Sequence, residues 1–186
     1  KFILFSTLLA VWLGVKAQTE TNISLGSGYA KQVFFSVQNG EVGEIDLNSW
    51  DLAFSTSGRG SVIRFNGAAG NSLYKYPKGN VDAWASVDTV GMDNWNDPLY
   101  DSDTSWSSTA FNQYTLNSMD LGWGIYNFIT HLVNGDSIYL FQDVQGNMKK
   151  FYVDRLQGGT YYLVHANLDG SDSATAEISK TDYLTK

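Results

Sequence analysis

Short segments rich in valine, isoleucine, phenylalanine and tyrosine recur along the chain, and Asn-Gly, Gly-Asn and Asp-Gly pairs separate them. This pattern is typical of antiparallel strands joined by tight turns. Early strands are predicted at residues 33–37, 50–55, 62–65 and 73–76. Asn39-Gly40 suits a hairpin turn, because both residues tolerate the positive φ that such a turn requires.

The last third of the chain predicts a meander of four antiparallel strands, at residues 124–133, 137–142, 148–154 and 160–166. In the first of these, apolar side chains occupy both alternating positions, as expected of a strand whose two faces are covered. No long helical pattern follows residue 17. The predicted fold class is therefore all-β, with antiparallel sheets packed as a sandwich.

Residues 91–118 separate the two groups of strands and have no steady hydrophobic period. The segment is polar and acidic but carries Trp95, Trp106, Phe111 and Tyr114. Aromatic side chains at this density argue against disorder. The segment is predicted to be a long functional loop region.

The first seventeen residues have the features of an export signal. Lys1 precedes an apolar run of fourteen residues, shorter than the roughly twenty that a membrane-spanning helix needs. Val15-Lys16-Ala17 suits a cleavage site, which would make Gln18 the mature N-terminus. The predicted product is a single domain over residues 18–186 that is secreted or held at the outer cell surface.

Charge and composition limit the kinds of partner and site that the protein can have. The chain has a net charge of −7, and removal of the signal, which contains two basic residues and no acidic ones, leaves −9. Nucleic acid and anionic membrane surfaces are poor partners for such a protein, because both require a basic patch. The absence of cysteine excludes disulfides and thiolate sites.

Several stretches together resemble the HmuY family of secreted haem-binding proteins from Bacteroidetes, over about two thirds of the mature chain. In the early part they are Phe34-Phe35-Ser36, Gly40-Glu41-Val42, Trp50-Asp51-Leu52-Ala53-Phe54 and Arg64-Phe65-Asn66-Gly67. In the late part they are Gly122-Trp123, Ser137-Ile138-Tyr139-Leu140-Phe141, Gly146-Asn147-Met148-Lys149-Lys150 and Gly159-Thr160-Tyr161-Tyr162.

The resemblance implies an all-β protein of the cell surface and, from the family's best known member, haem held between two axial histidines. It also implies an outer-membrane receptor as a possible partner. Many proteins that resemble this family carry a C-terminal sorting domain for type IX secretion, and a continuation of the native chain beyond Lys186 is one expectation from it.

Haem needs axial donors over an apolar cleft, and histidine and methionine are usual donors. The candidates are His131, His165, Met92 and Met119. Alternation places His131 on the face of Ile125, Ile129 and Val133. The alternative is that each histidine is a hydrogen-bonded core residue.

A second interpretation is a glycan-binding or adhesion module, in which exposed aromatic rings stack on sugars. The platform candidates are Trp84, Trp95, Trp106 and Tyr114, and the alternative for each is burial beneath the loop. A third interpretation is a surface scaffold without a small ligand.

Calcium and catalysis are weaker hypotheses. Carboxylates that could converge on calcium are Asp93, Asp97, Asp101, Asp103, Asp169 and Asp172, although such residues are more often solvated turns. The chain has no Gly-x-Ser-x-Gly elbow and no phosphate-binding glycine loop. We therefore expect a binding protein rather than an enzyme, with haem as the leading candidate ligand.

Overall fold

The computed structural model describes residues 20–57, 60–95 and 97–183. The predicted export signal and its cleavage site lie outside these residues. The chain divides into two compact units, Lys1–Ile45 and Asp46–Lys186. Each unit is described by itself, and the expectation of a single domain over residues 18–186 stays a prediction.

The described part of the first unit is built around one hairpin. A 3₁₀ turn, η1 (Ser27–Tyr29), precedes β1 (Lys31–Ser36), which pairs with β2 (Gly40–Asp46). Gly40 opens β2 with a φ of 78°, so the hairpin expected at Asn39-Gly40 is confirmed. The predicted strand at residues 33–37 corresponds to β1.

The second unit contains nine strands among its described residues. They are β3 (Leu52–Phe54), β4 (Ile63–Phe65), β5 (Ser72–Lys75), β6 (Gly124–Asn127), β7 (Leu132–Gly135), β8 (Tyr139–Gln142), β9 (Met148–Gln157), β10 (Thr160–Asn167) and β11 (Ala174–Ser179). Short 3₁₀ turns precede, connect or follow these strands: η2 (Leu47–Ser49), η3 (Gly67–Ala69), η4 (Val81–Ser86), η5 (Met92–Asn94), η6 (Ala110–Asn112) and η7 (Lys180–Tyr183). The all-β prediction is confirmed.

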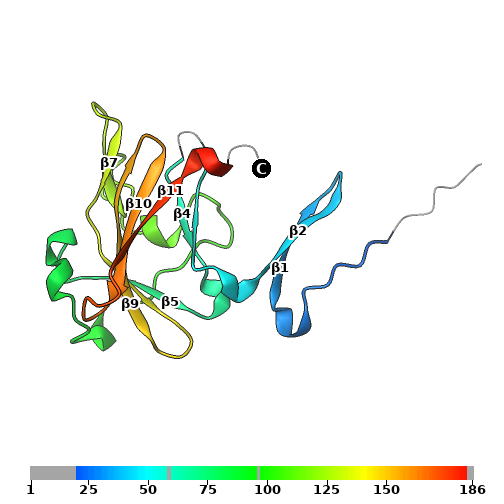
Figure 1. Cartoon of the computed structure of the whole chain (residues 1–186), viewed down its shortest axis with the longest axis horizontal. Coiled ribbons are helices and arrows are strands. Elements are labelled where there is room, and N and C mark those ends of the chain that lie inside the picture. Colours follow the sequence, from blue (N-terminus) through cyan, green and yellow to red (C-terminus); the bar gives the residue numbers. More distant parts are fainter. Residues whose placement is uncertain (1–19, 58–59, 96, 184–186) are drawn as a thin grey trace, which may run out of the picture. The chain divides into compact units, whose positions relative to one another are not determined.

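Seven of these strands form one antiparallel sheet, in which β11, β10, β9, β7 and β6 are successive neighbours (Figure 1). β9 has ten residues, long enough for two strands to share its other edge. β7 pairs near Leu156 and β8 pairs near Phe151, and β5 then pairs with β8. No helix among the described residues is long and apolar enough to cross a membrane.

The small β3–β4 sheet packs against the large sheet, as a sandwich requires. Ile63 and Phe65 from β4 share one buried cluster with Phe151 and Tyr161 of the large sheet. The ring of Phe54 lies 5.0 Å from the ring of Tyr161. Each fully buried side chain of this size contributes about 1.5 to 3 kcal/mol to stability.

The opposite face of the large sheet carries a second cluster. Ile138 and Leu140 are fully buried there with Tyr76, and Trp84 and Trp95 pack against them. Tyr139, between Ile138 and Leu140 in the chain, points into the first cluster. β8 therefore buries side chains on both of its faces.

The predicted strand at residues 124–133 is wrong in two respects. A turn at residues 128–131 divides it into β6 and β7. Its two faces are not both covered, because Ile125, Phe128 and Ile129 are 41%, 66% and 75% exposed. The Asn127 Oδ1 accepts the N–H groups of Ile129 and Thr130, at 2.9 and 3.1 Å, and this closes the turn. His131 follows with a φ of 55°. His131 therefore lies in a turn and not on the strand face assigned to it from alternation.

Candidate functional site

His131, the leading haem-ligand candidate, is exposed in the turn between β6 and β7. Its Nδ1 shares a hydrogen bond of 2.6 Å with the hydroxyl of Tyr126. Tyr126 is half-buried and packs against the first cluster, so it ties the imidazole to the sheet. The other ring nitrogen, Nε2, makes no hydrogen bond to any described residue.

Met119 lies beside the same hairpin. Its carbonyl accepts the N–H of Tyr126 at 2.8 Å, and its side chain is 40% exposed. Phe128 and Ile129, in the turn, are 66% and 75% exposed. We call Met119, Tyr126, Phe128, Ile129 and His131 the β6–β7 tip.

The structure does not bring His165 to this tip. Leu156 of β9 pairs with Val133 on one side and with Tyr161 on the other, so these residues lie at one level of the sheet. His131 precedes that level by two residues, and His165 lies four residues beyond it in the opposite direction. At about 3.3 Å per residue the two histidines are roughly 20 Å apart along the strands, so they cannot be the axial pair of one iron.

Met92 also lies elsewhere. It opens η5, where its carbonyl accepts the N–H of Trp95 at 3.0 Å, and its side chain is half-buried. The structure therefore gathers two of the four predicted haem donors, His131 and Met119, in one place.

The four aromatic platform candidates have different surroundings. Trp84 and Trp95 are half-buried against the second cluster, with Trp84 edge-on to Tyr152 at 5.1 Å between ring centroids. Trp106 is 85% exposed and Tyr114 is 47% exposed. Trp84 and Trp95 are thus partly covered by the second cluster, whereas Trp106 and Tyr114 are exposed.

A hollow of about 370 Å³ lies beside Trp106, and we call it the Trp106 hollow. Its lining residues are Ala53, Phe54, Ser55, Val62, Arg64, Trp106 and Ser107. The guanidinium carbon of Arg64 lies 4.6 Å from the centroid of the Trp106 ring. Asp101 holds Arg64 in place through a contact of 3.3 Å with Nε, and it also accepts the backbone N–H groups of Phe65 and Ala110.

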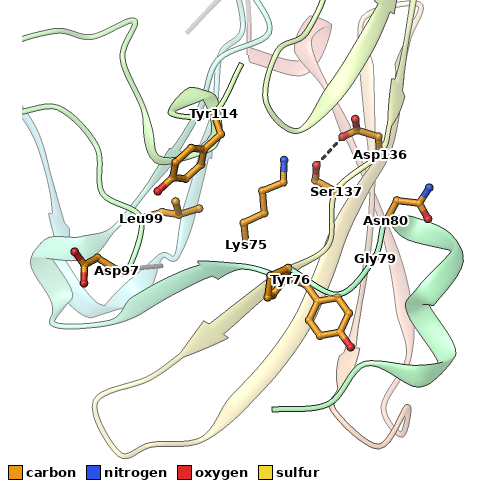
Figure 2. A pocket seen from close by; sticks show the side chains of 10 residues that line it. Lys75, Tyr76, Gly79, Asn80, Asp97, Leu99, Tyr114, Asp136 and Ser137 are labelled. Atoms are coloured by element: carbon orange, nitrogen blue, oxygen red, sulfur yellow. Dashed lines mark hydrogen bonds between the residues drawn. The ribbon is translucent and has the colours of Figure 1, made fainter. Parts of the chain in front are cut away.

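A second hollow, of about 380 Å³, includes Tyr114 in its lining (Figure 2). Figure 2 shows Lys75 between Tyr114 and a hydrogen-bonded pair formed by Ser137 and Asp136, whose oxygens are 2.6 Å apart. The Nζ of Lys75 also reaches the carbonyl of Gly122 at 3.5 Å. In this hollow, Ser137 and Asp136 are thus hydrogen-bonded to each other, and Lys75 contacts the main chain.

The calcium candidates are engaged with other protein groups or stand apart. Asp169 accepts hydrogen bonds from the hydroxyl and N–H of Ser171, which lower the pKa of Asp169. Asp172 pairs with Lys149 at 3.0 Å. Exposed candidates with no such network are Asp93, Asp97 and Asp103. Among the described residues, no group of three or more histidine or carboxylate side chains is placed to hold a metal ion.

Comparison of this chain with protein-family models, curated proteins and solved structures finds no match. The resemblance to the HmuY family therefore stays a prediction.

Sequence analysis missed two features of these sites. Phe128 and Ile129 were assigned to a strand, because aromatic and β-branched residues favour strands. Tyr126 does lie in a strand, β6, but its hydrogen bond to His131 was not predicted. The contact of Arg64 with Trp106 had no local signal, since the two residues are 42 positions apart in the chain.

Proposed function

We propose that this protein captures haem, or a related planar tetrapyrrole, at the β6–β7 tip by non-covalent binding at the cell surface after export. The observation that carries the proposal is the exposed imidazole of His131, fixed at Nδ1 by the hydroxyl of Tyr126 at 2.6 Å. No catalysed reaction is part of the proposal.

The donor set suits this cargo. A porphyrin supplies four ligands to its iron, so the protein needs to add only one or two axial donors. His131 can offer Nε2, while the Tyr126 hydroxyl orients the ring through Nδ1, as outer-shell partners of ligating histidines commonly do. The Met119 thioether is the second donor candidate, because its main chain is hydrogen-bonded to that of Tyr126.

The apolar side chains of the tip support the same ligand class. Phe128 and Ile129 extend into solvent, although burial of such side chains stabilises a protein. Exposed apolar residues grouped together commonly mark a surface that binds something. A tetrapyrrole offers a broad apolar face for them to cover.

A visible-absorption titration with ferric haem tests the proposal. The wild type is expected to shift the Soret band at micromolar protein, and His131→Ala to abolish that shift. Tyr126→Phe should weaken binding by about 10-fold to 100-fold, the usual effect of losing an outer-shell partner. Met119→Ala should alter the spectrum or weaken binding.

His165→Ala is the matched control, since His165 lies roughly 20 Å from the tip along the strands. It should bind haem as the wild type does. A wild-type protein that leaves the haem spectrum unchanged would contradict the proposal, as would a His131→Ala variant with full affinity.

A further inference from the structure

Trp106 is the most exposed tryptophan that the structure describes, at 85%. A large apolar ring in water forgoes the stabilisation that burial would bring. By contrast, Trp84 packs against the second cluster of the large sheet. The exposure of Trp106 therefore needs a reason beyond packing.

The main chain around Trp106 is held on both sides. Arg64 donates from Nη1 to the Trp106 carbonyl at 2.9 Å, and Asn112 donates from Nδ2 to the Ser107 carbonyl at 2.6 Å. A backbone bond of 3.0 Å from the Ser102 N–H to the Ser108 carbonyl closes the loop. The exposed ring is thus presented from a fixed backbone, which reduces the entropy that a ligand would have to remove.

Arg64 positions the ring but offers little free charge. Its guanidinium lies against the indole at 4.6 Å, and its Nε contacts the carboxylate of Asp101 at 3.3 Å. No lysine or arginine occurs between Lys78 and Lys149, whereas Asp103 lies on the same loop as Trp106. This surrounding disfavours an anionic ligand.

The Trp106 hollow combines two kinds of lining. Phe54 and Val62 are apolar, and Ser55 and Ser107 bring hydroxyl groups. Its volume of about 370 Å³ is at the small end of the range for ligand sites, roughly 300 to 1,000 Å³. An amphipathic ligand with a flat C–H face and a rim of hydroxyls matches this lining.

We propose that the Trp106 hollow binds a neutral sugar ring, with the ring's C–H face on the indole and its hydroxyls toward Ser55 and Ser107. This site shares no residue with the β6–β7 tip and does not depend on haem capture. Arg64 is a positioning residue in it, because it supports the indole and the Trp106 carbonyl.

Isothermal titration with cellohexaose, mannohexaose, xylohexaose and trigalacturonate tests the proposal. At least one of the three neutral sugars is expected to bind. Trp106→Ala should weaken that binding about tenfold or more, the usual effect of removing a central aromatic contact, and Trp106→Phe should restore part of it. Arg64→Met should weaken binding less than Trp106→Ala does.

Tyr100→Ala is the matched control, because Tyr100 is also exposed on this loop but does not line the hollow. It should leave sugar affinity unchanged. The proposal is overturned if no neutral sugar binds at roughly millimolar concentration, if only trigalacturonate binds, if Trp106→Ala keeps full affinity, or if Tyr100→Ala loses affinity equally. The haem titration of the Trp106 variants should match the wild type, so the two proposals fail separately.

Discussion

Trp84 and Trp106 each have a cation–π contact, but they differ in how exposed they are. Each ring lies against a cation, Trp84 under the Lys150 Nζ at 4.7 Å and Trp106 against Arg64 at 4.6 Å. Trp84 also meets the edge of Tyr152 on β9, whereas Trp106 stays 85% exposed. A cation contact alone does not bury an aromatic ring, and burial requires a second element of the sheet.

The two cations also differ. Lys150 is 1% exposed and donates to the Trp84 carbonyl at 2.8 Å, and its burial lowers the pKa of its ammonium group. Arg64 instead pairs with a carboxylate, Asp101. One contact therefore belongs to the packing of the second cluster, and the other holds a ring at the surface.

The largest expected difference between the two tryptophans is in how much each ring stabilises the fold. Trp84→Ala is expected to lower the free energy of unfolding by about 3 kcal/mol, because it leaves a cavity beside Tyr152 and Lys150. Trp106→Ala is expected to change it by less than about 0.5 kcal/mol, since the side chain is mostly in water. Urea unfolding followed by circular dichroism measures both, and equal losses would show that Trp106 is a packing residue.

Asp101 should be the key support of the exposed ring. Asp101→Ala is expected to lower the free energy of unfolding by about 2 kcal/mol, because Arg64 and the N–H groups of Phe65 and Ala110 lose their acceptor. The same urea experiment measures the loss, with the exposed Asp103→Ala as control. A loss no larger than that of the control would mean that Asp101 does not organise the loop.

The effect of Lys150 on stability should depend on pH. In the unfolded chain its ammonium titrates near the ordinary lysine value of 10.5, and burial lowers the pKa in the folded protein. Between those two values the unfolded state binds more protons, so the wild type gains stability relative to Lys150→Met as pH rises from 7 toward 10.5.

Urea unfolding of both proteins across this pH range measures the difference. Lys149→Met removes the same charge from the exposed neighbour that pairs with Asp172, so its difference from the wild type should not rise in this way. A flat or falling difference for Lys150→Met would show that the buried ammonium has no depressed pKa.

The positions of many strands along the chain could be predicted locally, but not their order in the sheet, where β7 pairs with β9 and not with β8. The C-terminal strands were located to within a few residues, because alternation and turn chemistry act over neighbouring positions. β11 was not assigned to the predicted meander, since Ala174 to Ser179 is poor in large apolar residues. The β6–β7 turn was missed because Phe128 and Ile129 favour strands, and the Asn127 side chain outweighed that preference.

The sequence could identify candidate site residues, but not which of them are exposed or lie close together. The exposed His131, Met119 and Trp106 were named from the sequence, and so were Met92, His165 and Trp84, which are half-buried. Nothing local separates the two groups, because exposure depends on which strands pack against each side chain.

Patterning within short stretches determined the antiparallel all-β class and the hairpins, because strand and turn preferences depend on adjacent residues. Tertiary structure decided which tryptophan is buried and which is presented. The contacts around these rings join residues far apart in the chain: Lys150 is 66 residues from Trp84, and Arg64 is 42 residues from Trp106. Such distant contacts form only when the sheets pack together.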